Sequence, residues 1–568
     1  MKGIPASPGI AIGRVLKLEE PAIVIEHKAV ADPEAEVARF EAAVQTALIQ
    51  VCAIAEAVRR QGHHAEAQVF EAHQLMLEDP EWHSRIAGHI REEALAAEAS
   101  VDCVTQEFIA LFEALDDEYL RARAIDLKDV SGRVVKNLLG IRPPDLAALT
   151  EPVILTARDL TPSDTALLRK ETVLGFITAL GNKTSHTAII ARTLGIPAIV
   201  GFPEIQEVPD GTLLALDGDT GEIWPVPTVE QQTLLELKRD AQLADRQSLE
   251  ALRGLPSVTA DGFRVEVSGN IGKPENTKFV LEHDGEGIGL FRSEFLFMDR
   301  ETAPTEEEQF EAYSSVAIHM KGRPVVIRTL DAGGDKHIPY INTGEEMNPF
   351  LGFRAIRICL ADPCLFRTQL RAILRASAHG NVRIMFPMIA TLAEWRAAKA
   401  AVEAAKAELK AEGIPFDEAL EIGIMVEIPS AVVLADLFAK EVDFFSIGTN
   451  DLTQYTLAAD RMNERLEVLY STFNPAVLRL IRQVIQAGNA AGKWVGMCGE
   501  AAGDLRMIPL LIAMGLEEFS MAPATILRAR RLIRSLDRSA LQPLLAEVMA
   551  MDDAQAIEAR MEAFLKTL

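Results

Sequence analysis

Two spacings of apolar residues alternate along the chain and divide it into regions. Short apolar segments in residues 1–18 are typical of strands, whereas residues 32–139 are rich in Ala, Glu, Leu and Arg with helical spacing. Strand-like segments then return, at 152–155, 173–177 and 198–200. This order predicts a helical bundle inserted into a smaller α/β unit.

The second half of the chain follows a different pattern. A polar segment rich in Gln, Glu and Leu, residues 228–252, is typical of a helix that links two domains. Short apolar segments then alternate with helical ones, at 264–270, 287–291, 325–329, 383–387, 422–427, 443–448, 494–498 and 518–521. Strands and helices in this alternation predict a (β/α)8 TIM barrel, and an open doubly wound sheet is the alternative that the pattern leaves.

Together these patterns predict a multidomain α/β protein. We expect a discontinuous α/β domain at 1–20 and 145–227, a helical insert at 21–144, a linker helix at 228–254 and a barrel at 255–568. A chain of 568 residues is long enough for several hydrophobic cores, and a single core is not expected at this length.

The charge balance narrows the possible functions. The chain has 57 Lys and Arg residues against 83 Asp and Glu, a net charge of −26, which argues against nonspecific nucleic-acid binding. An anionic substrate would therefore need a locally basic pocket. The chain has no long uncharged apolar run and its first residues lack the apolar core of a signal peptide, so we expect a cytoplasmic protein without membrane insertion. The five cysteines have no metal-ligand spacing.

One histidine lies at the predicted start of a helix. The stretch Gly181-Asn182-Lys183-Thr184-Ser185-His186-Thr187 leads into a helix predicted at 188–194, which ends at Gly195. A helix N-terminus offers unpaired backbone N–H groups to an anion, and Thr184 or Ser185 can cap it. We hypothesise that His186 carries a phosphoryl group; a capped structural histidine is the alternative.

Polar residues also follow the predicted barrel strands. TIM-barrel enzymes build their active sites at the C-terminal ends of several strands, so side chains there are expected to converge. The residues at these positions are Arg292, Arg328, Glu427, Asn450, Asp451 and Cys498.

These residues, together with a few other basic residues of the second half, offer three kinds of chemistry. Glu427 and Asp451 suit Mg²⁺, although either could be a helix cap or a surface carboxylate. Cys498, between glycines, is a candidate proton donor, with a small core residue as the alternative. Planar guanidinium groups for phosphate and carboxylate oxygens come from Arg292, Arg328 and Arg354, with Arg357, Lys336 and Arg461 in support.

Five segments resemble the phosphoenolpyruvate-utilising enzymes, and nearly the whole chain is similar to the Enzyme I family of the bacterial phosphotransferase system. The segments are TSHT at 184–187, GIGLFRSEFLF at 287–297, DAGGDK at 331–336, NPFLGFR at 348–354 and FSIGTNDLTQY at 445–455. Departures from the family pattern are mild: Asn182 stands for a glycine, Lys183 for an arginine and Ser293 for a threonine.

The resemblance implies a swivelling phosphohistidine domain in which His186 takes the phosphoryl group of phosphoenolpyruvate. It implies that Glu427 and Asp451 hold Mg²⁺ and that Cys498 donates the proton that completes pyruvate. Phosphoenolpyruvate would be bound by Arg292, Arg328, Arg354, Asn450, Asp451 and Arg461. Supporting roles would fall to Thr165, whose hydroxyl would hold Nδ1 of His186, and to Thr184, Ser185 and Lys336.

The resemblance also implies two protein partners. One is the phosphocarrier protein HPr, docked on the helical insert, and the other is a second copy of the chain, paired through the barrel. A docking stripe for a basic partner is predicted at Glu66, Glu71 and Glu78, with His73 and Leu75 nearby; a solvated helix face is the alternative.

Two rival functions remain. One is an enzyme like pyruvate phosphate dikinase or phosphoenolpyruvate synthase, but the chain has no recognisable glycine-rich nucleotide loop. The other is a silent scaffold that senses phosphoenolpyruvate, and intact His186, Glu427, Asp451 and Cys498 argue against it.

Overall fold

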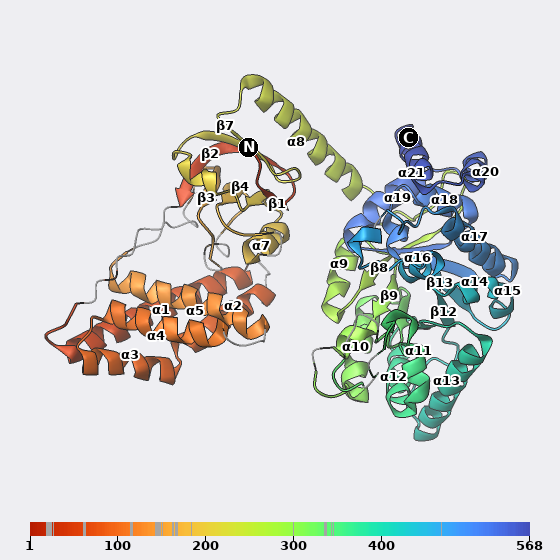
Figure 1. Ribbon diagram of the computed structural model, residues 1–568, viewed down its shortest axis with the longest axis horizontal. Helices are drawn as coiled ribbons and strands as arrows, with labels where there is room; N and C mark the ends of the chain where they lie inside the picture. Colours follow the sequence, from red (N-terminus) through yellow and green to blue (C-terminus); the bar gives the residue numbers. More distant parts are fainter. Residues whose placement is uncertain are drawn as a thin grey trace. The chain divides into compact units, whose positions relative to one another are not determined.

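The computed structural model contains two compact units, Met1–Asp245 and Arg246–Leu568 (Figure 1). It describes residues 1–18, 25, 28–60, 64–113, 118–141, 149, 151–161, 164, 168–182, 185–298, 300–333, 338–341, 344, 346–466 and 468–568. Each unit is described by itself.

The helical region of the first unit is a bundle with its own core. Its helices are α1 (Pro33–Arg60), α2 (His64–Leu77), α3 (Pro80–Glu93), α4 (Ala97–Glu113) and α5 (Glu118–Leu138). Pro33 and Pro80 are the first residues of α1 and α3, where the missing N–H of proline costs no helical hydrogen bond. The Asp79 side chain caps α3 by accepting from Trp82 N at 2.8 Å. Apolar faces meet in a core that includes Phe40, Val44, Val51, Trp82, Ile86, Val101 and Val134.

Among the described residues, the segment Pro33–Glu56 of α1 is long and apolar enough to cross a membrane, by length and composition. Phe40, Val44 and Val51 from this segment are buried in the bundle core. Packing between helices therefore accounts for part of its apolar character.

The proposed docking stripe on α2 needs one correction. His73 is 1% exposed, and its Nε2 lies 3.3 Å from Asp126 Oδ1, so it belongs to the bundle interior and not to a docking surface. Leu75 is 71% exposed, and Glu71 and Glu78 are also exposed. The side chain of Glu66 lies outside the described residues.

The α/β part of the first unit is built on a seven-stranded sheet in the order β1-β5-β4-β3-β2-β6-β7. The strands are β1 (Ile4–Ser7), β2 (Ile10–Leu18), β3 (Val153–Ala157), β4 (Val173–Thr178), β5 (Ala198–Val200), β6 (Leu213–Asp217) and β7 (Glu222–Pro225). Strands β2 and β3 are parallel neighbours, so the whole bundle is inserted between two strands that pair directly.

Both faces of this sheet are covered. Successive strand residues point to opposite faces. Leu155 accordingly packs with Ala188 and Ala191 of α7 (His186–Leu194), while Ile154 packs on the other face with Ile205 of the 3₁₀ helix η2 (Pro203–Glu207).

The polar segment after β7 forms the long helix α8 (Val229–Glu250). In the first unit, Leu235 packs with Ile10 and Ala215, and the ammonium group of Lys238 pairs with the Asp217 carboxylate. Further along the helix, in the second unit, Ser248 Oγ accepts from Arg531 Nη1 at 3.2 Å.

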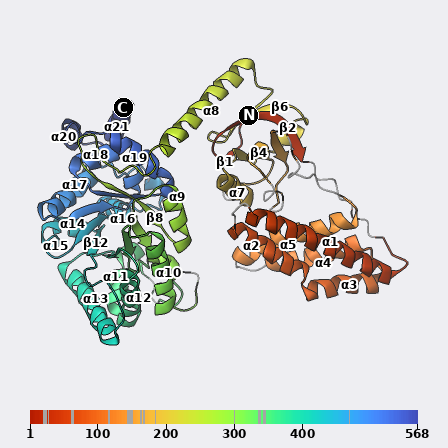
Figure 2. The same ribbon diagram turned by 180° about the vertical axis from the view of Figure 1, so that it is seen from behind.

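The second unit contains a closed barrel of eight parallel strands, β8 to β15 (Figure 2). This confirms the predicted (β/α)8 barrel and excludes the open sheet. The strands are β8 (Glu266–Ile271), β9 (Ile288–Arg292), β10 (Val325–Arg328), β11 (Val382–Phe386), β12 (Ile422–Val426), β13 (Phe444–Ile447), β14 (Trp494–Met497) and β15 (Glu518–Met521).

Helices pack outside the barrel strands. They are α9 (Thr277–Glu282), α10 (Glu306–His319), α11 (Ile356–Ala361), α12 (Pro363–Ser377), α13 (Leu392–Glu412), α14 (Pro429–Val433), α15 (Ala435–Phe438), α16 (Thr449–Leu457), α17 (Pro475–Ala490), α18 (Ile508–Met514), α19 (Ile526–Ser535), α20 (Gln542–Ala550) and α21 (Ala554–Leu565). Short 3₁₀ turns complete the unit at η3 (Pro274–Asn276), η4 (Ser293–Leu296), η5 (Pro349–Leu351), η6 (Glu464–Leu466), η7 (Glu500–Gly503) and η8 (Pro523–Thr525).

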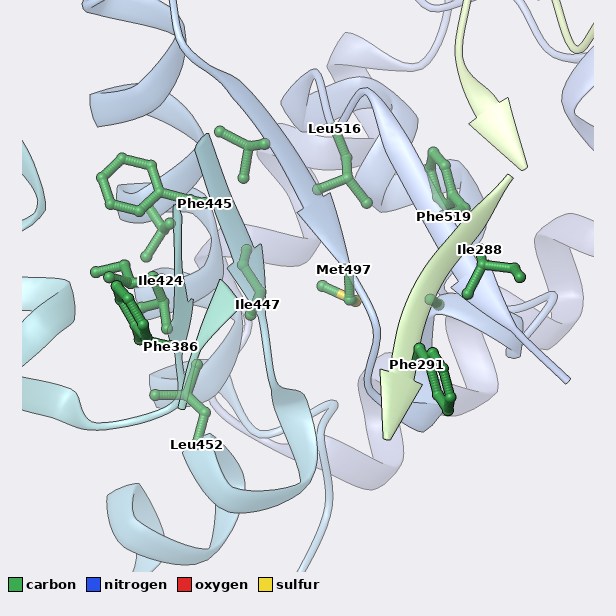
Figure 3. Close-up of a cluster of buried hydrophobic side chains, with 14 of the residues drawn as sticks. Ile288, Phe291, Phe386, Ile424, Phe445, Ile447, Leu452, Met497, Leu516 and Phe519 are labelled. Atoms are coloured by element: carbon green, nitrogen blue, oxygen red, sulfur yellow. The ribbon is translucent and has the colours of Figure 1, made fainter. Parts of the chain in front are cut away.

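Barrel strands bury both of their faces. Outward side chains such as Phe386, Ile424, Phe445 and Phe519 pack in the large core beneath the helices (Figure 3). Alternate residues form a separate buried cluster inside the barrel, made of Leu290, Val326, Met385, Met425, Phe444 and Cys498.

Candidate active site

His186 is the first residue of α7. Ser185 caps the helix, because its Oγ accepts from Ala188 N at 3.4 Å, and Gly195 ends it in the left-handed conformation at φ 63°. Thr187 in the first turn donates to the Leu160 carbonyl at 3.3 Å, which ties this turn to the preceding loop. The predicted capped helix start is therefore present, and the helix begins two residues earlier than predicted.

Some predicted residues cannot be assigned a geometry. Thr165, Thr184 and Lys336 lie outside the described residues, and so does the side chain of His186.

The other candidates lie at the C-terminal ends of the barrel strands. Arg292 and Arg328 are the last residues of β9 and β10, and Glu427 follows β12 directly. Asn450 and Asp451 lie in the first turn of α16 after β13, and Cys498 follows β14. Since all eight strands are parallel, these residues share one end of the barrel, which we call the mouth.

Arg328 is held between two carboxylates at the mouth. Its guanidinium group bonds to Glu294 and lies 2.9 Å from Asp331 Oδ2. Burial alone would lower the pKa of Arg328. Asp331 and Glu294 outweigh burial and raise the pKa overall, so the guanidinium group stays charged.

Arg354 reaches the same cluster from the segment before α11. Its Nη2 is 2.9 Å from Asp331 Oδ1 and 3.4 Å from Asp451 Oδ2, and its Nη1 donates to the Tyr455 hydroxyl at 3.2 Å. Arg461 Nη1 lies 3.1 Å from the other oxygen of Asp451. Two guanidinium groups therefore converge on Asp451.

These arginines retain donors for a ligand. The Nε atoms of Arg328 and Arg354 are buried and have no hydrogen-bond partner among the described residues. Arg292 is partly buried and makes no ion pair within the described part of the chain. Buried donors of this kind suit phosphate or carboxylate oxygens.

Glu427 is a buried carboxyl group beside Asp451. Its Oε1 accepts from Met388 N at 2.6 Å. Burial, and then the neighbouring Asp451, raise the pKa of Glu427 to about 8. A Cβ at residue 448 would come within 3.0 Å of Glu427 Oε2, so Gly448 leaves room for this carboxyl group.

The pair fits a hard divalent cation. Glu427 and Asp451 supply carboxylate oxygens from neighbouring strand ends, and a cation would relieve the repulsion that raises the Glu427 pKa. No group of three or more His, Cys, Asp or Glu side chains able to hold a metal occurs in the described residues. Mg²⁺ usually takes one or two protein carboxylates and completes its shell with water and substrate oxygens.

Cys498 lies at the top of the barrel interior and is 3% exposed. Burial raises the pKa of its thiol to about 12, while the nearby Ser446 hydroxyl acts in the opposite direction. Asn270 Nδ2 donates to the Cys498 carbonyl at 3.0 Å and fixes the backbone there. The thiol is therefore protonated at neutral pH, as a proton donor must be.

Asn450 is already engaged. Its Nδ2 donates to Glu500 Oε1 at 3.3 Å, and its Oδ1 accepts from Glu500 N at 3.1 Å. The side chain thus ties the turn after β13 to the loop after β14.

Three residues that contact the candidates were not singled out from the sequence as site residues: Glu294, Asp331 and Tyr455. Glu294 and Asp331 come two and three residues after the ends of β9 and β10, within the family-like segments, and this position was the signal available. Tyr455 comes one helical turn after Asp451 and ends the family-like segment at 445–455, so only its place in that segment could have indicated it.

Three family models match the chain. Residues 2–123 match the N-terminal region of PEP-utilising enzymes, residues 149–221 match their mobile domain and residues 246–538 match their PEP-binding domain. The last of these spans more than half of the chain.

Curated relatives match over nearly their full length. The phosphoenolpyruvate-protein phosphotransferase of Staphylococcus carnosus (strain TM300) is 50% identical over 567 residues, covering 100% of this chain and 99% of the relative. That of Priestia megaterium is 50% identical over 98% of this chain and 97% of its own, and that of Listeria innocua serovar 6a (strain ATCC BAA-680 / CLIP 11262) is 48% identical over 99% of both. The chain therefore belongs to the phosphoenolpyruvate-protein phosphotransferase family of PEP-utilising enzymes.

Proposed function

We propose that this chain transfers the phosphoryl group of phosphoenolpyruvate to His186, releasing pyruvate, and then passes it to a histidine of HPr as the first step of the sugar phosphotransferase system. The observation that carries this proposal is the mouth of the barrel, where arginines, paired carboxylates and a protonated thiol meet. Membership of the phosphotransferase family supports the same reaction.

Substrate binding falls to the arginines. The unpartnered Nε donors of Arg328 and Arg354 would bind substrate oxygens, with Arg292 and Arg461 beside them and Asn450 and Asp451 at the edge. Phosphoryl transfer depends mainly on positioning and on charge neutralisation, and fixed guanidinium groups provide both.

Glu427 and Asp451 would hold Mg²⁺, which when bound neutralises negative charge on the transferring phosphoryl group. The residues around this pair have their own tasks. Met388 N orients the Glu427 carboxyl group at 2.6 Å, and Arg354 and Arg461 orient the two oxygens of Asp451.

Cys498 supplies the proton. When the phosphoryl group leaves phosphoenolpyruvate, the enolate remains, and its C3 takes the proton from Sγ to give pyruvate. Burial keeps Sγ protonated until then, because it raises the pKa of the thiol to about 12. Removal of the enolate makes the transfer hard to reverse.

His186 acts as a mobile carrier. It lies in the first unit and the barrel forms the second, so one histidine must reach the barrel mouth to be phosphorylated and the carrier protein to be discharged. The Ser185-capped N-terminus of α7 would stabilise the phosphohistidine between these encounters. Thr165, Thr184 and Lys336 are proposed as supporting groups, and α8 as the swivelling link between the domains at 1–20 with 145–227 and at 255–568.

The remaining parts of the proposal concern assembly. HPr would dock on the insert at 21–144, and two copies of the chain would pair through the barrel. The chain would act in the cytoplasm, where phosphoenolpyruvate is available.

The decisive experiment is incubation with ³²P-labelled phosphoenolpyruvate and Mg²⁺ in the absence of nucleotide. We expect acid-labile, base-stable label on the protein that disappears in His186→Ala. Label that requires ATP would assign the chain to the dikinases, and no label under either condition would favour a scaffold.

A further inference from the structure

Inside the barrel, three side chains surround a residue that has none. Gly496 on β14 pairs in register with Ser446 on β13 and with Glu518 on β15. A Cβ at residue 496 would lie 2.2 Å from Glu518 Oε2, so the carboxyl group of Glu518 occupies the space above this glycine. Cys498 lies two residues further along β14 and faces the same interior. A thiol, a hydroxyl and a carboxyl group therefore border one small volume.

This volume holds polar atoms that lack partners. Glu518 is 4% exposed and Ser446 is 1% exposed. Neither Glu518 Oε1 nor Ser446 Oγ has a hydrogen-bond partner of normal geometry within the described residues. Buried polar atoms are normally satisfied, so the Ser446 hydroxyl is available to the neighbouring Cys498 thiol, while Glu518 Oε2 lies over Gly496 between them.

The polar path continues to the opposite end of the barrel. Glu266 on β8 is the register partner of Glu518, and its Oε1 accepts from Ser268 Oγ at 2.8 Å. Arg383 lies over the Trp494 ring at 4.7 Å at the same end of the strands. Glu266 is partly exposed, so solvent protons reach it.

Charges around the path favour protonated carboxyl groups. Burial, followed by the neighbouring Glu266, raises the pKa of Glu518 well above its usual range, and Arg383 offsets only part of this. Burial likewise raises the pKa of Glu266, against smaller effects of Ser268, Arg383 and Arg264, with Glu286 adding to the rise. Both carboxyl groups therefore hold a proton more tightly than an exposed glutamate does, and burial is the main cause.

We propose that Glu518 restores the thiol of Cys498 after each turnover, passing a proton through the Ser446 hydroxyl and drawing its replacement from solvent through Glu266. This inference rests on the proposed function, in which Cys498 protonates the enolate. The route would supply protons from the end of the barrel opposite to the mouth.

The protons balance at each step. The S–H bond of Cys498 breaks as a C–H bond forms at C3 of the enolate, leaving a thiolate. That thiolate takes the proton of the Ser446 hydroxyl as Ser446 takes the proton of Glu518. The Glu518 carboxylate, beside Arg383, is then protonated from Glu266 and solvent. One solvent proton is consumed for each pyruvate formed.

An interior route has a clear kinetic benefit. A thiolate left facing bound pyruvate can take a proton back from the methyl group and regenerate the enolate. Solvent reaches this thiol poorly from the mouth, because Cys498 is 3% exposed even without a substrate. Rapid protonation of the thiolate from the end of the barrel opposite to the mouth would commit the enzyme to product release.

The test is rapid-quench kinetics on the full-length protein with ³²P-labelled phosphoenolpyruvate, Mg²⁺ and excess HPr. Glu518→Gln keeps the shape and hydrogen bonds of the side chain but carries no transferable acid proton. We expect one equivalent of pyruvate and of His186 label at a rate within about twofold of wild type, followed by steady turnover slowed at least about tenfold. Ser446→Ala should produce the same burst.

Two further measurements separate proton supply from folding. Val326→Ala loosens the same interior without touching the path, so it should lower thermal stability but produce no burst. Imidazole at high concentration, a small acid that would approach the thiol slowly from the mouth, should partly speed the slow phase of Glu518→Gln and leave wild type unchanged.

Contrary outcomes are equally clear. Unchanged steady turnover in Glu518→Gln, or an equal loss of its first and later turnovers, would overturn the relay while leaving the proposed function intact. If Glu518→Gln does not fold, Ser446→Ala decides by the same criteria. Absence of label on wild-type His186 would instead overturn the proposed function itself.

Discussion

The guanidinium group of Arg354 lies 3.4 Å from the carboxylate of Asp451, so a proposed substrate ligand and a proposed metal ligand are paired with each other. Arg354 is 1% exposed and also holds Asp331 at 2.9 Å. The charges at the mouth therefore neutralise one another within the protein. Ligands that enter must compete for groups that are already positioned, which keeps the site preorganised.

Replacing this guanidinium group should weaken substrate binding. Arg354→Lys keeps the charge but loses the planar fork, so we expect the KM for phosphoenolpyruvate to rise at least about tenfold. Arg357→Lys is the matched control, because among the described residues Arg357 donates only to the backbone carbonyls of Leu351 and Gly352. Steady-state kinetics on both variants provide the measurement, and equal effects would argue against a specific role for Arg354.

Binding of Mg²⁺ should depend on pH through Glu427. Its pKa is raised to about 8, mainly by burial, and a cation requires the ionised form. Below that pH each bound ion must displace a proton, so the apparent affinity should fall by up to about tenfold per pH unit. Calorimetric titrations between pH 6 and 9 measure this, together with the protons released. A flat affinity over that range would contradict the assignment of Glu427 as a ligand.

The same shift predicts how the metal-free protein responds to pH. The Glu427 carboxyl group binds its proton more tightly in the folded than in the unfolded state, so its contribution to stability is lost as pH rises from about 4.5 to about 8. Added Mg²⁺ should therefore raise the melting temperature more at pH 8 than at pH 6. Glu427→Gln should remove this difference.

A buried glutamine should position the substrate arginines. Gln369 Nε2 donates to Ser293 Oγ at 3.0 Å, and its Oε1 accepts from Leu330 N at 2.9 Å. It thereby joins the segment after β9, which follows Arg292, to the segment after β10, which follows Arg328. In Gln369→Leu we expect a stability loss of about 1–3 kcal/mol from the unpaired Leu330 N–H, and a KM for phosphoenolpyruvate that rises more than kcat falls.

Tyr313→Phe is the control for this network. It removes one partner of Gln369, the hydroxyl at 3.1 Å, but keeps the bonds to Ser293 and Leu330. Its KM should stay close to that of wild type. A loss of stability in Gln369→Leu with unchanged KM would show that the glutamine supports folding alone.

The packing of α8 against the sheet of the first unit should depend on Asp217. This carboxylate is 1% exposed, pairs with Lys238 and accepts from Asp219 N at 2.9 Å and Thr220 N at 3.2 Å. Asp217→Ala should destabilise the first unit by about 1–3 kcal/mol, because Lys238 and the two N–H groups lose a buried acceptor. Thermal unfolding of the full chain, followed by hydrogen exchange in α8, would locate the loss. Asp219→Ala, which removes an exposed partner of Gln242, is the milder control.

Burial raises the pKa of Asp217, but Lys238 and the two N–H groups outweigh it and lower the pKa overall. This contribution to stability is therefore present at neutral pH and is lost as pH falls below about 4. In Asp217→Ala, the free energy of unfolding of the first unit should therefore fall less steeply below about pH 4 than in wild type. An unchanged acid transition would contradict the importance of the pair.

Local patterns along the chain were sufficient for the elements of the fold. Each of the eight barrel strands begins and ends within two residues of its predicted position, because buried strands are short apolar runs between helical segments. The start of α7 at His186 was also readable, since Ser185 and Gly195 are typical of helix ends. The burial of His73 could not be predicted in this way, because the residues beside it in the sequence do not distinguish a buried histidine from an exposed one.

The sequence by itself determined which elements form, which residues follow the barrel strands and to which family the motifs are similar. Only the tertiary structure decided how those residues act on one another. Arg328 and Arg354 share Asp331 although the two arginines are 26 positions apart, and the pKa of Glu427 is raised by burial and then by Asp451 from the next strand end. Burial and through-space charge depend on strand closure, and neither is encoded in local spacing.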